Sequence, residues 1–154
     1  MTKNPFLQKF NLIYFTLIAS MSFFGVVVYF LCQNEMAGEA DPKLIKLLRN
    51  VLAFAVPLFL IAGHFIFQQI VKRIDPKLEF EQKLSNYGQA LLIRGAFLET
   101  PGLLISVIAL LTGRVSFLML LPLVIITFIV LRPKVESIST DLKLSTQEKE
   151  ALEV

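Results

Sequence analysis

Three ionisable residues, Glu99, Arg94 and His64, lie within long apolar segments of the sequence. A charged group in the middle of a membrane span costs at least about 2.5–3.5 kcal/mol unless another group compensates it. A carboxyl group there can bind and release a proton or an ion, and histidine changes its charge near neutral pH. These three residues are therefore the candidate intramembrane polar site.

Glu99 shares one helix face with small residues. Residues three or four positions apart lie above one another on a helix, and the small residues follow this spacing around Glu99. They are Gly88, Gly95, Gly102 and Ser106. Small side chains let two helix backbones approach closely in lipid. We predict that this glycine face packs against another helix, with Glu99 protonated or hydrogen-bonded at the contact.

Pro101 and Arg94 leave alternatives open for the same helix. Pro101 cannot donate a hydrogen bond to the carbonyl oxygen of Phe97, so we expect a kink beside the carboxyl group. Such a kink serves either an ion or proton site or packing alone. Arg94 is five residues from Glu99, about 140° around an ideal helix, which does not favour a direct ion pair. It is expected either to reach the lipid headgroups or to act together with Glu99.

His64 is the single histidine of the chain, near the end of the second apolar segment. We expect a neutral, hydrogen-bonded imidazole, and contacts with Glu99 or Tyr87 are the functional alternatives. One histidine and one cysteine make no pattern for a metal site or a catalytic nucleophile, and no glycine-rich phosphate loop is present. We therefore predict no catalytic residues, no metal and no cofactor, and an enzyme is not favoured.

Four apolar blocks must position these residues. Hydrophobic residues make up 55% of the 154 positions, and a span needs about 20 of them to cross a hydrocarbon core of about 30 Å. The blocks cover about residues 11–32, 51–71, 88–112 and 115–131. Residues 1–133 are predicted to form an all-α integral membrane domain, an antiparallel bundle of four transmembrane helices. Residues 134–154 form a polar tail, and the lipid bilayer is the first predicted partner.

Basic residues are unevenly divided between the two ends of this bundle. The richer end has Lys3, Lys9, Lys72, Arg73, Lys77, Lys83, Arg132, Lys134, Lys143 and Lys149, and the poorer end has Lys43, Lys46, Arg49 and Arg114. The positive-inside rule then places both termini in the cytoplasm. The first span is too long for a signal peptide and is expected to be retained. The net charge of +3 thus indicates topology, and no nucleic-acid partner is expected.

Polar residues next to prolines predict where the helices begin. Asn4-Pro5, Asp41-Pro42 and Asp75-Pro76 each combine a capping side chain with proline at the first helical position. Gly113 is predicted to end the third helix. In the tail, Ser145-Thr146-Gln147-Glu148 is a capping-box pattern that predicts a short helix within an otherwise solvated end.

The sequence Ala90–Glu99, ALLIRGAFLE, followed by TPGLL, resembles the carboxylate-bearing helix of rotary ATPase proteolipid (c) subunits. In that family a glutamate in a helix of small residues carries the translocated proton or sodium ion. The resemblance covers one helix in four and implies that Glu99 is an ion-binding carboxyl group. The overall layout also resembles small, uncharacterised four-span proteins of bacterial cytoplasmic (inner) membranes, which implies that location and no particular activity.

Two functions are compatible with these observations. The first is a non-enzymatic multi-pass membrane protein that associates with itself or with a larger membrane complex through the glycine face of the third span. The second is a small ion- or proton-coupled translocation subunit that uses Glu99. Four spans are few for an independent transporter, so the second function requires an oligomer.

Overall fold

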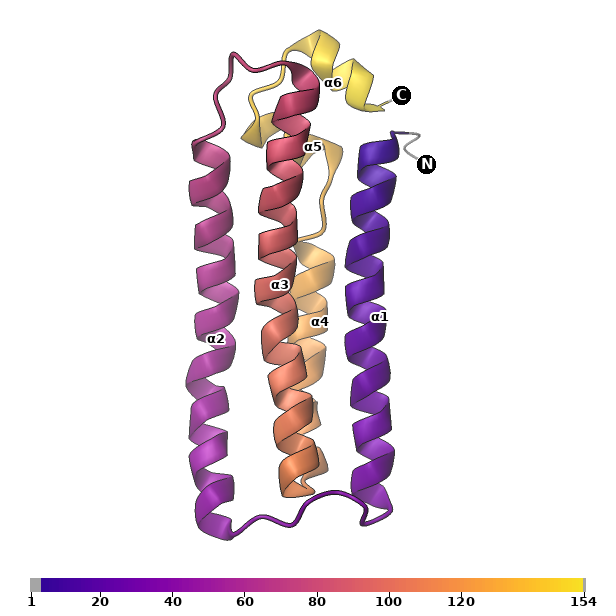
Figure 1. Cartoon of the computed structure of the whole chain (residues 1–154), viewed down its shortest axis with the longest axis vertical. Helices are drawn as coiled ribbons and strands as arrows, with labels where there is room; N and C mark the ends of the chain where they lie inside the picture. The colour runs from indigo at the N-terminus through magenta and orange to yellow at the C-terminus, as the bar shows by residue number, and fades with distance from the viewer. Residues whose placement is uncertain (1–3, 154) are drawn as a thin grey trace.

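The computed structural model describes residues 4–153, and these residues form an all-helical bundle. The elements are α1 (Pro5–Gln33), α2 (Pro42–Lys72), α3 (Phe80–Thr112), the 3₁₀ helix η1 (Val115–Leu120), α4 (Leu121–Val130), α5 (Val135–Asp141) and α6 (Thr146–Glu153). Figure 1 shows α1, α2 and α3 side by side, with successive long helices running in opposite directions and α4 behind α3. The predicted all-α class is confirmed.

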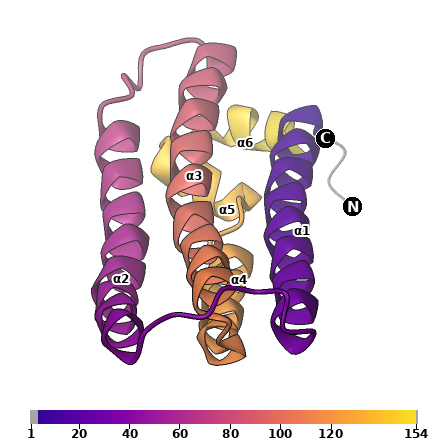
Figure 2. The same cartoon turned by 60° about the horizontal axis from the view of Figure 1, so that its bottom comes forward.

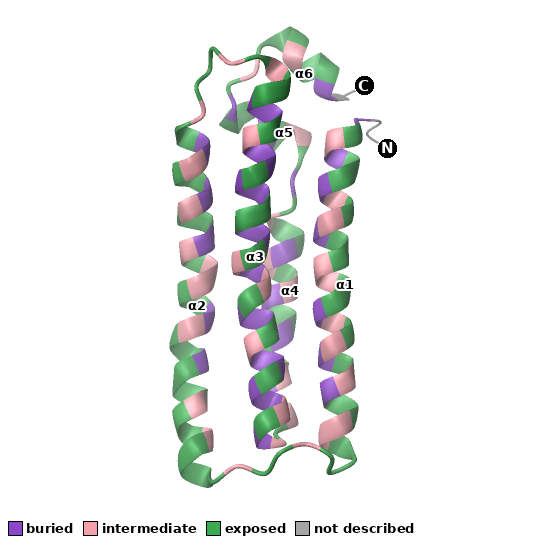
Figure 3. Ribbon diagram, in the orientation of Figure 1, coloured by how far each residue is buried: buried purple, intermediate pink, exposed green. Residues whose placement is uncertain are grey.

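Helix α3 is the centre of the bundle. Helices α1 and α2 and the η1–α4 segment all pack on it, and 50% of its most apolar stretch is buried, against 17% in α1 and 22% in α2. The buried residues of α1 and α2 lie on the sides that face α3 (Figure 3). Helices α1 and α3 begin at the same end of the bundle and run parallel (Figure 2). One central helix therefore supplies the largest share of the core, and its neighbours each bury a single face.

Three helices, α1, α2 and α3, are long and apolar enough to cross a membrane. A fourth candidate span combines residues 115–130 with α5, two parts that are bent by 69°. Large apolar side chains on the outward faces are more than half exposed, among them Phe23, Phe54, Ile61 and Ile126. Apolar surface of this extent marks contact with lipid or with another protein. The structure thus supports a membrane protein with three to four candidate spans.

Two of the three predicted helix starts are confirmed, as is one helix end. Asn4 accepts a hydrogen bond at Oδ1 from the amide of Phe6 (2.9 Å), and Asp41 caps α2 in the same way through the amide of Lys43 (2.8 Å). At the end of α3, Gly113 has a positive φ of 64°, the backbone region in which glycine is favoured over other residues.

The third predicted start is wrong, because Asp75-Pro76 does not begin α3. The amide of Leu78 donates to the carbonyl oxygen of Asp75 (3.2 Å), so these residues form a β-turn with proline at its second position. The same side chain that would cap a helix, Asp75, instead accepts from the amide of Lys77 within the turn (2.9 Å). Helix α3 begins only at Phe80.

The tail is docked on the bundle, which corrects the prediction of a solvated end. Helices α5 and α6 lie across the end where α1 and α3 begin (Figures 1 and 2). Three apolar side chains of the tail, Ile138, Leu142 and Leu152, are buried in the common core. The predicted capping box is present: the amide of Ser145 donates to Glu148 Oε2 (2.8 Å), and the amide of Glu148 donates to Ser145 Oγ (3.3 Å).

Two polar contacts join α6 to the starts of the long helices. The ammonium group of Lys83 on α3 lies 2.7 Å from Oε1 of Glu148 on α6. Asn4 donates from Nδ2 to the carbonyl oxygen of Ala151 (3.1 Å). The tail prediction failed because these partners are 65 and 147 residues away along the chain, beyond any local pattern.

Candidate functional site

The glycine face of α3 is filled by side chains of α1. A Cβ atom on Gly102 would lie 1.8 Å from the sulfur of Met21, and one on Gly88 would lie 2.6 Å from the ring of Phe10. Gly95 lies under Leu17, 3.2 Å from where its own Cβ would be. Side chains of another helix therefore cover this face. Its partner in the structure is α1 of the same chain.

Ser106, the fourth small residue of this face, and Pro101, the predicted kink residue, are both buried. Ser106 is buried, and its hydroxyl donates to the carbonyl oxygen of Gly102 (3.1 Å) within α3. Pro101 is also buried, and α3 continues through it as one α-helix.

Glu99 lies on the outward side of the contact between α1 and α3. It is partly exposed, and its Oε1 atom is 3.4 Å from the hydroxyl of Ser20, which also lies 3.0 Å from the carbonyl oxygen of Leu17. Ala96 and Thr100, next to Glu99 on α3, are exposed. We call this region, formed by Ser20, Ala96, Glu99 and Thr100, the Glu99 seam.

Arg94 is buried, with only 6% of its surface exposed, and it lies apart from the Glu99 seam. Its Nε donates to the hydroxyl of Tyr14 (3.1 Å), and one terminal nitrogen donates to the carbonyl oxygen of Leu131. The guanidinium carbon is 4.0 Å from the ring centre of Phe67, a cation–π contact. Arg94 therefore does not pair with Glu99, and it joins α1, α2, α3 and the end of α4.

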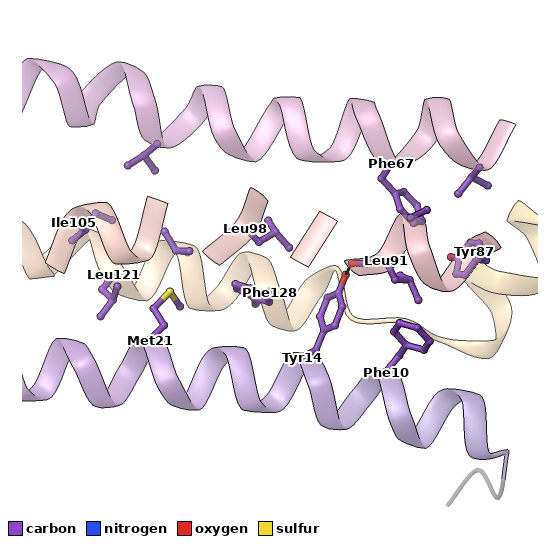
Figure 4. Close-up of a cluster of buried hydrophobic side chains, with 14 of the residues drawn as sticks. Phe10, Tyr14, Met21, Phe67, Tyr87, Leu91, Leu98, Ile105, Leu121 and Phe128 are labelled. Atoms are coloured by element: carbon purple, nitrogen blue, oxygen red, sulfur yellow. Dashed lines mark hydrogen bonds between the residues drawn. The ribbon is translucent and has the colours of Figure 1, made fainter. Parts of the chain in front are cut away.

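Two tyrosines that the sequence analysis did not assign to a site complete this network. Tyr14 accepts from Arg94 and donates to the carbonyl oxygen of Leu91 (3.2 Å), a bond that Figure 4 shows between α1 and α3. Tyr87 packs edge-on against Phe67 (5.5 Å between ring centres) and donates to Asp141 Oδ2 on α5 (2.8 Å). A tyrosine inside an apolar segment needs a partner for its hydroxyl group. Tyr14 and Tyr87 were therefore the residues in the sequence that could have indicated a buried polar network.

His64 and Arg94 line one cavity of about 440 Å³ between α2 and the α4–α5 end of the bundle. The imidazole is exposed and lies 3.0 Å from the amide nitrogen of Gln68, one turn along α2. We call this space the interfacial cavity. Its lining residues are His64, Phe67, Gln68, Arg94, Val130, Leu131, Arg132, Glu136, Ser137, Thr140 and Asp141.

The interfacial cavity contains charges of both signs. Arg94 and Arg132 are cations, and Glu136 and Asp141 are acids. Within residues 4–153, no group of three histidine, cysteine, aspartate or glutamate side chains is placed to hold a metal ion. The structure thus separates the predicted polar site into two places: Arg94 with His64 at the cavity, and Glu99 at its seam.

Comparison with protein-family models, with curated proteins and with solved structures finds no match to this chain.

Proposed function

We propose that this protein is a non-enzymatic, multi-pass protein of a bacterial cytoplasmic membrane, with four antiparallel spans and both termini in the cytoplasm. The richer set of basic residues supports this topology, because it lies where α1 begins, α2 ends and the tail docks. Segment η1–α4 supplies the fourth span. Its six 3₁₀ and ten α-helical residues give about 27 Å of rise, close to the thickness of the hydrocarbon core.

We further propose that the protein acts through helix–helix association with a second copy or with a larger membrane complex. The observation that carries this proposal is the exposure of Glu99 midway along an apolar helix, with Ser20 as its hydrogen-bond partner at 3.4 Å. A carboxyl group facing hydrocarbon is costly, so a helix that covers it is favoured. Ala96 and Thr100 are small enough for close approach of that helix.

This proposal moves the predicted contact from the glycine face to the Glu99 seam. The glycine face is occupied by Phe10, Leu17 and Met21 of α1, so an incoming helix would first have to displace α1. The outward side of α3, between α1 and α2 in Figure 1, needs no such displacement.

Cysteine cross-linking in membranes tests the association. In a Cys32→Ser background, Ala96→Cys and Thr100→Cys should form disulfide-linked dimers if the second helix comes from another copy. Leu58→Cys and Ile126→Cys, exposed on α2 and α4, are matched controls that should stay monomeric. If the seam cysteines do not cross-link and no other membrane protein co-purifies in mild detergent, the association proposal is rejected.

The second candidate function is ion or proton translocation at Glu99, in line with the resemblance to proteolipid subunits. Its specific support is the pair of oxygen-bearing side chains, Glu99 and Ser20, inside apolar helices. The expected result is a proton flux in liposomes that Glu99→Gln abolishes while the variant still folds. Absence of flux in the wild type under a pH gradient would reject this candidate and leave the association proposal standing.

A further inference from the structure

We propose that the interfacial cavity binds the headgroup of a zwitterionic phospholipid, one that carries a phosphodiester and a primary ammonium group. This inference rests on the proposal that the bundle spans a bilayer, and it adds a ligand class to that function. The cavity lies at the end of the bundle that bears most of the basic residues, where the apolar part of α4 ends.

The charges of the cavity are ordered along the bundle. The guanidinium group of Arg94 lies at the end of α4, where it contacts Leu131. Glu136 and Asp141 belong to α5, which lies beyond the end of α4 (Figure 1). The cationic group is thus nearer the apolar part of the bundle, and the carboxylates are nearer the tail. Going outward from the acyl chains of such a lipid, the phosphate follows the glycerol and the ammonium group comes last. The phosphate would thus lie at the level of Arg94 and the ammonium group at the level of the carboxylates.

Arg94 is already oriented for an oxyanion. A guanidinium group has five N–H donors in a fixed plane, and two hydrogen bonds, to Tyr14 and Leu131, hold that plane against the ring of Phe67. The side chain also lines the cavity, so its remaining donors are available to phosphate oxygens. Arginine held in this way binds phosphate with little further loss of conformational freedom. Arg132, at the rim, adds a second positive charge.

The acidic wall selects the other half of the headgroup. A primary ammonium group donates hydrogen bonds to Glu136 and Asp141, whereas a trimethylammonium group cannot donate and a glycerol headgroup carries no positive charge. Two carboxylates also disfavour a headgroup whose net charge is negative. The expected order of affinity is therefore ethanolamine, then choline, then glycerol headgroups.

The surroundings of the cavity suit a lipid better than a soluble phosphate ester. Phe67, Val130 and Leu131 form an apolar wall. One turn further toward the middle of the bundle, Ile61 on α2 and Ile126 on α4 are exposed. An acyl chain that leaves the cavity in this direction meets apolar surface, which a soluble ester would not use.

The test is binding of short-chain phospholipids to the detergent-purified full chain, measured by native mass spectrometry. The probes are dioctanoyl phosphatidylethanolamine, phosphatidylcholine and phosphatidylglycerol, with free phosphoethanolamine as the soluble ester. We expect the ethanolamine lipid to bind about tenfold more tightly than the glycerol lipid, a difference of about 1.4 kcal/mol. Equal binding of all three lipids overturns the inference, and binding of free phosphoethanolamine as tight as that of the lipid overturns the lipid source.

Two rim variants separate the roles of the charges. Glu136 and Arg132 are exposed, so their substitution should leave the fold intact. Glu136→Lys should reverse the preference, so that the glycerol lipid binds more tightly than the ethanolamine lipid. Arg132→Gln should weaken the binding of all three lipids. Lys134→Gln and Lys143→Gln, exposed tail residues outside the cavity lining, are controls that should match the wild type. An unchanged preference in Glu136→Lys contradicts the inference.

Carbonate extraction of cell membranes distinguishes failure of the spanning proposal from failure of the lipid inference. A chain that is released from membranes by carbonate contradicts the spanning proposal itself. A chain that stays in the membrane fraction but shows no headgroup preference contradicts only the lipid inference.

Discussion

Arg94 donates a hydrogen bond to the carbonyl oxygen of Leu131 and thereby caps the end of helix α4. The last carbonyl groups of a helix have no partner within it, and a cation near them is favourable. Leu131 is partly buried, so water cannot fully replace this contact. The contact gives a structural reason for a buried cation inside a predicted membrane span.

Substitution of Arg94 should therefore destabilise the fold. Arg94→Leu leaves the Leu131 carbonyl and the Tyr14 hydroxyl without their donor, and we expect a loss of about 2–4 kcal/mol in the free energy of unfolding. Arg114→Leu, at an exposed position at the other end of the bundle, should have little effect. Unfolding in detergent followed by circular dichroism measures both, and equal stability of the two variants would contradict the assigned role.

Substitutions at Gly102 and Met21 should have coupled effects on stability. In Gly102→Ala the new methyl group would overlap the sulfur of Met21, and overpacking of this kind costs about 1–3 kcal/mol. Met21→Ala in the same chain should recover part of that loss. Gly95→Ala is the matched control, because its Cβ would lie 3.2 Å from Leu17 and should cost less. Thermal unfolding of Gly102→Ala, Met21→Ala, the double variant and Gly95→Ala measures the coupling, and additive effects would mean that the α1–α3 contact is looser than described.

The ion pair between Lys83 and Glu148 should hold the tail. Glu148→Gln removes the charge opposite the buried Lys83 ammonium group, and we expect docking to weaken by about 1 kcal/mol. Hydrogen exchange of the α5 and α6 amides should then become faster while α3 stays protected. The exposed Glu150→Gln variant serves as the control, and exchange as fast in Glu150→Gln as in Glu148→Gln would refute the specific role of the pair.

Tail docking should depend on pH only under acidic conditions. The hydrogen bonds from the Lys83 ammonium group and the Ser145 amide lower the pKa of Glu148 from 4.5 to about 2. A lowered pKa in the folded state adds stability that is complete above 4.5 and is lost as the pH falls toward about 2. After correction for intrinsic exchange rates, the protection of the α6 amides should thus stay constant between about pH 5 and 8. A docking transition near neutral pH would contradict this assignment.

The helical class and the inward face of α3 were predictable from the sequence. Long apolar blocks depend only on composition and length, and the seven-residue spacing of Gly88, Gly95 and Gly102 fixes them to one face whatever lies opposite. The caps at Asn4 and Asp41 are local in the same sense, since each bond spans two residues.

The partners in the polar network were not predictable in this way. Arg94 bonds to Tyr14, which is 80 residues away, and to Leu131, which is 37 residues away. These pairings depend on how the helices are arranged, which no pattern in one helix encodes. The turn at Asp75 shows a different limit, because the same Asp-Pro pair suits both a helix start and a β-turn, and the structure uses it for the turn.

The parallel pairing of α1 with α3 has a consequence for biogenesis. Tyr14 and its acceptor Leu91 are 77 residues apart, so α1 leaves the ribosome well before the helix on which it packs. Until α3 is made, Phe10 and Met21 cannot pack against the glycines that they cover in the finished fold. Asn4 receives its contact with Ala151 only after α2, α3 and α4 have been made. Helix α1 precedes these three helices in the chain, yet it reaches its final environment only after they have been made.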